Sequence, residues 1–284
     1  MKNTLLSIGH GYSARALARL LDPLDWRIIG TVRSTKHAEE IAAQGVESLI
    51  WPDADLSKAL RSTTHLLTSV APIDSGDPVL NTLSNQIAAA PNLQWIGYLS
   101  TTAVYGDHQG GWVDETTALT PATKRGKLRV EAETEWQGFA EKQSLSLHIF
   151  RLAGIYGPGR GPFAKVRNGT ARRIIKKNQL FSRIHVEDIA QTLAASIASP
   201  NPGAVYNVCD NHAAPPEDVI AYAAKLLNLP VPAAEDWDTA DMTPMARSFY
   251  SESKRVRNDR IKLELGVSLI YPDYWSGLQA LLNS

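Results

Sequence analysis

The chain has few cysteines, no histidine spacing typical of metal sites and no long apolar run, and each of these absences excludes a class of protein. It has 284 residues but a single cysteine, Cys209, which excludes an internal disulfide and a cysteine-ligated zinc site. The seven histidines never occur at a spacing that would place two ligands on one helical face, so no metal site is expected. No apolar run approaches the ~18 residues of a membrane span, and the N-terminal run is too short for a signal peptide. The sequence therefore predicts a cytoplasmic protein without a membrane partner.

The chain also lacks an excess of charge of either sign. Lysine plus arginine and aspartate plus glutamate are balanced at 29 each, so no net field attracts nucleic acid. The apolar fraction of 44% and the charged fraction of 20% are typical of a globular enzyme or binding protein. The expected partner is therefore a small molecule.

Short apolar runs alternate with helical patterns through the first half of the chain. The runs indicate strands at residues 4–8, 26–32, 48–51, 65–70, 93–100 and 146–152, and helical patterns include residues 38–43 and 126–141. This alternation predicts an α/β fold, with a parallel sheet covered by helices on both faces.

The composition changes after residue 154. Glycine and proline cluster at 154–162, and basic residues gather at 167–177. A helix at 186–199 and a strand at 204–208 are expected to return to the main sheet, and later helices are expected at 215–227, 255–265 and 273–282. We therefore predict a main domain of residues 1–158 with 186–208, and a smaller substrate lobe of residues 159–185 and 209–284.

A glycine-rich turn, Gly9-His-Gly11-Tyr12-Ser13-Ala14, joins the first strand to the helical pattern that follows it. In Rossmann-type, doubly wound sheets the first glycine permits a sharp turn and the second lets a pyrophosphate approach the backbone. A small third residue then allows close packing of helix and strand, and the helix N-terminus attracts phosphate. The turn predicts a dinucleotide site; the alternative is a tight turn without a ligand.

The end of the second predicted strand points to the coenzyme type. NAD-binding folds usually carry an acidic residue there for the ribose hydroxyls, but this chain has Arg33, Ser34 and Lys36. Arg33 and Ser34 are suited to a 2′-phosphate, which favours NADP(H) over NAD(H), unless these residues are simply solvated. Ser69 and Ala71, at the end of the fourth strand, are expected near the adenosine and ribose.

Four ordered motifs carry a resemblance to a known family: the glycine turn, residues 99–106 (LSTTAVYG), residues 150–158 (FRLAGIYGP) and residues 182–190 (SRIHVEDIA). Together they resemble the extended branch of the short-chain dehydrogenase/reductase superfamily, which contains NAD-dependent epimerases and dehydratases. The resemblance implies that Thr101 is the catalytic hydroxyl residue. It also implies that Ser100 and Tyr156 lie near the coenzyme.

The same resemblance exposes a departure in the catalytic pair. Where the family has Tyr-x-x-x-Lys on the following helix, this chain has Arg125 and Arg129. An arginine stays protonated and cannot act as a base, so the standard chemistry needs another group, such as Tyr105, His108 or Tyr156.

Two arginines at this helical spacing would also suit an anionic substrate, although a solvated helix face is an alternative. Arg160, in the glycine-rich turn after the third motif, is a further candidate for a substrate phosphate.

Two functions remain open from the sequence. The first is an NADP-linked oxidoreductase, epimerase or dehydratase with non-standard catalytic residues, acting on a small or nucleotide-linked substrate. The second is a non-catalytic NADP(H)-binding sensor, which retains the coenzyme turn without the catalytic pair. A structural subunit without a ligand fits the glycine turn poorly, and a homodimer is compatible with either function.

Overall fold

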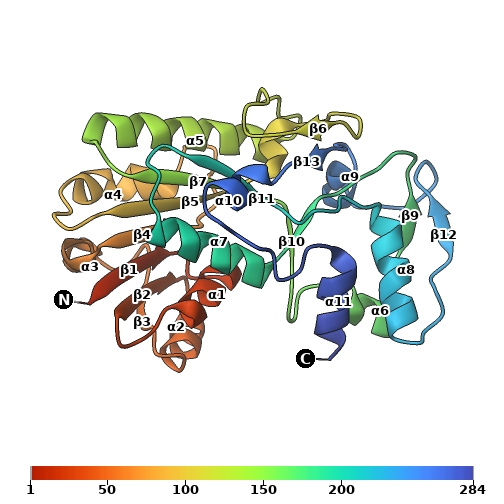
Figure 1. The fold of residues 1–284 in the computed structure, drawn as a ribbon, viewed down its shortest axis with the longest axis horizontal. Helices are drawn as coiled ribbons and strands as arrows, with labels where there is room; N and C mark the ends of the chain where they lie inside the picture. The colour runs from red at the N-terminus through yellow and green to blue at the C-terminus, as the bar shows by residue number, and fades with distance from the viewer. Residues whose placement is uncertain (1, 284) are drawn as a thin grey trace.

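A seven-stranded parallel sheet forms the centre of the computed structural model, which describes residues 2–283 (Figure 1). Its strands are β1 (Asn3–Ile8), β2 (Trp26–Val32), β3 (Glu47–Ile50), β4 (His65–Thr68), β5 (Trp95–Thr101), β7 (Leu147–Leu152) and β11 (Val205–Val208). Their order is β11-β7-β5-β4-β1-β2-β3, and every neighbouring pair is parallel. The chain is therefore an α/β protein with a Rossmann-like sheet, as the alternation of strands and helices predicts.

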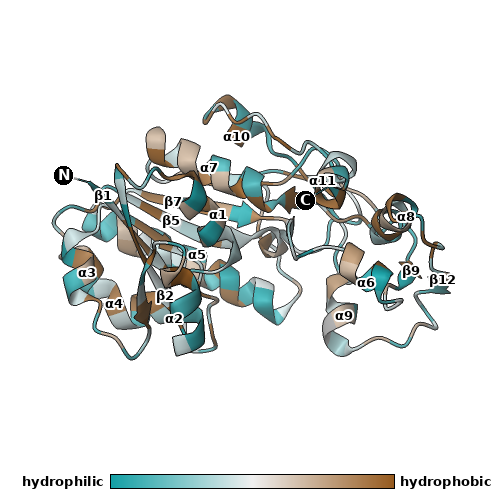
Figure 2. Cartoon of the chain, turned by 90° about the horizontal axis from the view of Figure 1, so that it is seen from below, coloured by the Kyte–Doolittle hydropathy of each residue, from teal (hydrophilic) through white to brown (hydrophobic). Residues whose placement is uncertain are grey.

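Helices cover both faces of this sheet. They are α1 (Tyr12–Leu20), α2 (Thr35–Ala42), α3 (Ser57–Ser62), α4 (Pro78–Ala88), α5 (Lys124–Gln143) and α7 (Val186–Ala198). Successive strand residues point to opposite faces, so Leu5 packs with α1 and α7 whereas Leu6 packs with α3, α4 and α5. The hydrophobic strands lie between helices that present hydrophilic residues outward (Figure 2). The sheet core is thus buried on both sides, which explains the continuous apolar runs of its strands.

The remaining elements lie mostly beyond the carboxyl ends of the strands, on the right of Figure 1. Three two-stranded parallel ladders pair β8 (Gly154–Tyr156) with β10 (Arg183–His185), β9 (Arg173–Ile175) with β12 (Ala234–Asp236), and β6 (Trp112–Val113) with β13 (Arg255–Val256). The other helices are the 3₁₀ helix η1 (Thr102–Tyr105), α6 (Phe163–Arg167), α8 (Pro216–Leu226), α9 (Pro244–Phe249), α10 (Asp259–Leu263) and α11 (Tyr274–Leu282). Residues of α6, α8 and α11 enclose a separate hydrophobic cluster, the core of a smaller lobe.

The single helix expected over residues 255–265 is wrong. This segment begins as β13, where Arg255 and Arg257 donate backbone hydrogen bonds to Gly111 and Val113, and only then forms the short α10. Pairing with a distant strand overrides the local helical pattern. The helix expected at 38–43 begins earlier, at Thr35, because the Ser34 side chain caps it.

Two histidines are buried among aromatic rings in the sheet. His65 lies 4.7 Å from Trp26, and His148 stacks on Trp95 with 5.7 Å between ring centroids. Burial lowers the pKa of each histidine to about 4. Between a pKa of 6.5 in the unfolded chain and about 4 in the folded chain, protons bind preferentially to the unfolded state. Stability contributed by the neutral rings is therefore present above pH 6.5 and is lost as the pH falls toward 4.

Acidification from pH 7 to pH 5 is accordingly expected to destabilise the protein, with each histidine adding a slope of up to about 1.4 kcal/mol per pH unit. Urea unfolding at several pH values measures this slope. His65→Phe should make the slope shallower, because phenylalanine keeps the aromatic packing without a titrating group. An unchanged slope in this variant would contradict the assignment.

Candidate functional site

The glycine turn lies at the centre of the sheet, between the carboxyl ends of β2 and β4. The Gly9 N–H donates to Thr31 Oγ1 at 2.8 Å, and Ser69 Oγ donates to the Gly9 carbonyl at 2.5 Å. Gly9 has a φ of +80°, and a Cβ there would lie 3.0 Å from Ser69 Oγ and 3.3 Å from Val70 Cγ2. Both the backbone conformation and the close packing therefore require glycine at this position.

At the second glycine of the turn, Gly11, neither of these two requirements for glycine applies. Its φ of −98° lies in the extended region, and an added Cβ would meet nothing closer than the Gly9 carbonyl oxygen at 3.7 Å. Neither strain nor internal packing thus excludes a side chain. Gly11 is also exposed and caps α1 without a side-chain hydrogen bond, which leaves the first N–H groups of the helix open to an external acceptor. The open side of Gly11 fits an approaching anion.

The remaining residues of the glycine turn either pack against the sheet or contact a second turn. Ser13 and Ala14, in the first turn of α1, are themselves buried, and their small side chains allow close packing of helix and sheet. The Tyr12 hydroxyl donates to the Pro158 carbonyl at 2.9 Å, and the Arg160 guanidinium carbon lies 5.7 Å from the Tyr12 ring centroid. Arg160, expected among the substrate ligands, is therefore placed beside the glycine turn.

At the neighbouring strand ends, the predicted coenzyme residues differ in whether they are exposed and whether their side chains already form hydrogen bonds within the protein. Arg33 is exposed just beyond β2, whereas Ser34 accepts the His37 N–H at 3.4 Å as the cap of α2. The Ser69 hydroxyl already donates its hydrogen bond to the Gly9 carbonyl, and Ala71 is exposed after β4. Arg33 is thus the group best placed for a further ligand at this edge.

The end of β5 presents Thr101 but turns Ser100 inward. Thr101 is half-buried, and its Oγ1 accepts the Ala103 N–H at 3.2 Å, which caps η1. Ser100 is 5% exposed, and its hydroxyl donates to the buried Glu133 carboxylate.

A buried polar network extends from this serine. Arg151 Nη2 lies 2.7 Å from Glu133 Oε2, and the two side chains are 5% and 2% exposed. Arg151 Nη1 also donates to the Tyr105 hydroxyl at 2.9 Å, which in turn donates to Asn207 Oδ1 at 2.7 Å. Burial raises the pKa of Tyr105 to about 12. Tyr105 is therefore poorly suited to act as a base, and the network instead holds the turn that carries Thr101.

The two arginines that the family resemblance aligns with the catalytic pair lie on α5 in different environments. Arg125 is exposed near the start of the helix. Arg129 Nη1 donates to the Leu99 carbonyl at 3.0 Å and to the Tyr98 hydroxyl at 2.9 Å, and it lies 3.4 Å from the Val70 carbonyl. Arg129 thus ties the ends of β4 and β5 together, while Arg125 extends toward solvent.

The other two groups considered as replacement bases are also constrained. Tyr156 is 6% exposed and donates to the Asp273 carbonyl at 3.3 Å, and burial raises its pKa. Its ring belongs to the hydrophobic cluster of the smaller lobe rather than to the end of β5. His108 Nε2 lies 3.1 Å from the Tyr105 carbonyl oxygen.

A buried polar cluster that the sequence did not reveal lies beside Gly106, directly after η1. Lys254 Nζ donates to the Gly106 carbonyl at 2.7 Å and to Glu252 Oε2 at 2.8 Å, and Gln179 Nε2 donates to the Glu252 carbonyl at 2.7 Å. Within the described residues, Glu252 Oε1 and Gln179 Oε1 are buried without a partner. No periodicity or motif marks these residues, because the chain brings them together from separate segments.

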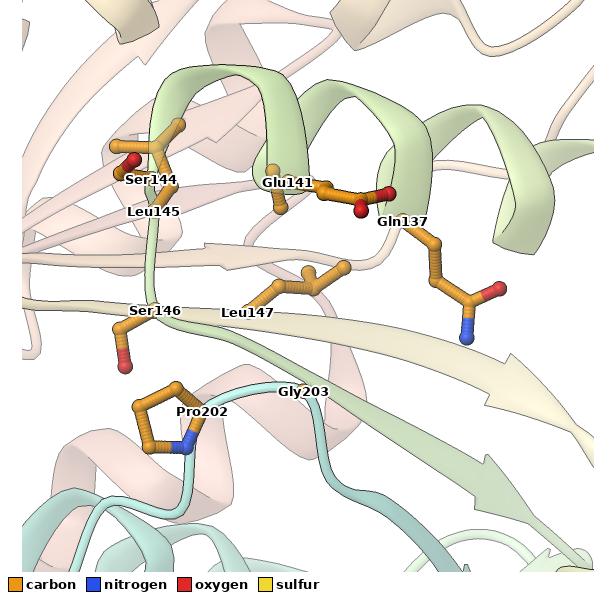
Figure 3. A pocket seen from close by; sticks show the side chains of 9 residues that line it. Gln137, Glu141, Ser144, Leu145, Ser146, Leu147, Pro202 and Gly203 are labelled. Atoms are coloured by element: carbon orange, nitrogen blue, oxygen red, sulfur yellow. The ribbon is translucent and has the colours of Figure 1, made fainter.

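Two hollows lie away from the glycine turn. One, of about 500 Å³, lies at the amino end of β7, where Leu147, Ser144 and Gln137 line it beside the end of α5 (Figure 3). The other, of about 380 Å³, includes Trp112 and Lys262. Within residues 2–283, no group of three His, Cys, Asp or Glu side chains could hold a metal ion, and no helix is long and apolar enough to cross a membrane.

Two solved enzyme structures share this fold. UDP-glucuronic acid 4-epimerase from Bacillus cereus, in complex with NAD, superposes with a TM-score of 0.78 at 16% identity, covering 99% of this chain and 96% of that one. dTDP-glucose 4,6-dehydratase from Bacillus anthracis, also with NAD, gives a TM-score of 0.79 at 16% identity, covering 100% and 96%. At this identity, the likeness shows a shared fold.

Two other proteins are more similar in sequence. Protein YeeZ of Escherichia coli K12 is 28% identical in an alignment of 280 positions, which covers 94% of this chain and 95% of that protein. No protein-family model matches the chain. A functionally unknown conserved protein from Silicibacter pomeroyi DSS is 63% identical, with a TM-score of 0.93 over 99% of both chains. The chain belongs to the same family as this Silicibacter protein.

Proposed function

We propose that this chain is a member of the short-chain dehydrogenase/reductase superfamily that binds a nicotinamide dinucleotide on the Gly9–Ala14 turn. The observation that carries the proposal is Gly11, which has neither a backbone strain nor an internal contact to explain its missing side chain. An approaching diphosphate supplies that explanation, because a side chain there would obstruct it. The uncapped N-terminus of α1 and the NAD complexes of the structurally similar enzymes support the same assignment.

We further propose that the coenzyme is NADP(H) rather than NAD(H), and that it serves an oxidoreductase, epimerase or dehydratase reaction. Arg33 is exposed beyond β2, where a 2′-phosphate would accept its hydrogen bonds. A bound nicotinamide would supply the hydride donor or acceptor. Thr101, held by the cap of η1, would orient a substrate oxygen, and the exposed Arg125 would attract an anionic group. The smaller lobe, residues 159–185 and 209–284, would hold a small or nucleotide-linked substrate.

Titration of the protein with NADPH and with NADH tests both parts of the proposal, with energy transfer from the seven tryptophans as the signal. We expect saturable binding of both, with NADPH tighter by about tenfold because of one additional charge-assisted contact. Arg33→Ala should remove this difference by weakening NADPH alone. Equal or tighter binding of NADH by the wild type would reverse the coenzyme preference, and no binding of either would reject the site.

A non-catalytic NADP(H) sensor is a second candidate, and specific observations favour it. The family resemblance aligns Arg125 and Arg129 with the catalytic pair, and Tyr105 and Tyr156 are buried with raised pKa values. NADPH oxidation in the presence of varied carbonyl compounds separates the two candidates. Turnover supports the enzyme, whereas tight binding without turnover supports the sensor.

A further inference from the structure

The glycine turn contacts a second turn that is far from it in sequence. The Tyr12 hydroxyl donates to the Pro158 carbonyl at 2.9 Å, across 146 positions of the chain. A Cβ at Gly157 would lie 2.5 Å from this hydroxyl and 2.7 Å from Val186 Cγ1. Only a glycine therefore allows the two turns to approach so closely.

This second turn, residues 157–160, has a well-defined backbone. The Gly157 N–H donates to the Arg160 carbonyl at 2.8 Å, and the Arg160 N–H donates to the Gly157 carbonyl at 2.9 Å. Gly159 has a φ of +71°, which glycine adopts without strain. The turn thus fixes the point from which the Arg160 side chain extends.

The Arg160 guanidinium lies beside the start of α1. Its carbon atom is 5.7 Å from the Tyr12 ring centroid, and Tyr12 is the first residue of α1. No ion pair within residues 2–283 includes Arg160. A cation without a carboxylate is therefore held next to the helix N-terminus that already favours an anion.

We propose that Arg160 is a coenzyme ligand, whose guanidinium contacts the diphosphate bridge of the dinucleotide bound at the glycine turn. The inference rests on the proposed function and adds a contact from outside the glycine turn itself. A guanidinium can donate two parallel hydrogen bonds to phosphate oxygens, and Tyr12 positions it for this contact by stacking. The diphosphate then connects the start of α1 to the turn that leads into α6.

The diphosphate is common to both coenzymes, which gives the proposal a distinctive signature. Arg160→Ala should weaken NADPH and NADH by the same factor, about tenfold for one charge-assisted contact. By contrast, Arg33→Ala should weaken NADPH alone. A matched control is Arg167→Ala, since Arg167 is an exposed arginine whose guanidinium carbon also lies 5.7 Å from an aromatic ring, that of Phe163, away from the glycine turn. This control should bind both coenzymes like the wild type.

Amide hydrogen exchange provides a readout that does not depend on affinity. At saturating NADPH, exchange of the peptide covering residues 157–162 should slow in the wild type and in Arg167→Ala, but not in Arg160→Ala. Saturable binding by the wild type with dissociation constants unchanged within twofold in Arg160→Ala would overturn the Arg160 contact and leave the coenzyme site intact. Absence of coenzyme binding by the wild type would overturn both proposals.

Discussion

Replacing Arg151 with methionine is expected to lower the free energy of unfolding by about 3–5 kcal/mol. The substitution leaves the Glu133 carboxylate buried without its cation, in a position where the two side chains are 5% and 2% exposed. It also removes the donor that Arg151 provides to the Tyr105 hydroxyl. For a chain of this size, such a loss corresponds to a fall in Tm of roughly 10 °C, measurable by calorimetry or circular dichroism.

A surface pair provides the control for burial. Arg27 and Glu47 form an equally close ion pair, at 2.6 Å, but their side chains are 41% and 55% exposed. Arg27→Met should therefore cost less than about 1 kcal/mol. Equal losses in the two variants would contradict the idea that desolvation of Glu133 causes the effect.

Replacing Gly11 with aspartate is expected to weaken coenzyme binding strongly without destabilising the protein. Aspartate is a favoured N-cap residue, so the variant should keep or raise the Tm through a new hydrogen bond at the start of α1. The same carboxylate occupies the open side of Gly11 and repels the diphosphate. We expect the dissociation constant for NADPH to rise by about 100-fold, or roughly 2.7 kcal/mol.

Gly11→Asn separates bulk from charge, because asparagine caps a helix equally well and has nearly the same shape. This variant should bind NADPH more weakly than the wild type and more tightly than Gly11→Asp. Unchanged NADPH affinity in Gly11→Asp would show that nothing binds at this face of the turn. A loss of Tm would show instead that Gly11 is required for folding.

Local patterns predicted the fold where the determining interactions are themselves local. The strand–turn–helix unit of the glycine turn depends on a few adjacent residues, and its position after β1 follows directly from their spacing. The buried strands of the parallel sheet appear in the sequence as short apolar runs, because both faces of each strand are covered.

The site residues could be predicted less well, because their partners come from distant segments. The pattern placed Ser100 on β5, but not its inward hydrogen bond to Glu133. Arg129 can be aligned with a family motif, yet only the fold shows that its guanidinium ties Leu99 to the preceding strand end. The cluster of Lys254, Glu252 and Gln179 has no sequence signature, and the pairing of β13 with β6 replaced an expected helix.

Because β13 comes late in the chain, it affects the order in which parts of the protein can fold during synthesis on the ribosome. A nascent chain that ends after β11 (Val205–Val208) already contains all seven strands of the central sheet. It lacks Lys254, whose ammonium group donates to the Gly106 carbonyl, and the strand that pairs with β6. The glycine turn can therefore form early in synthesis, whereas the surface around Gly106 is completed only when residues 252–256 have emerged.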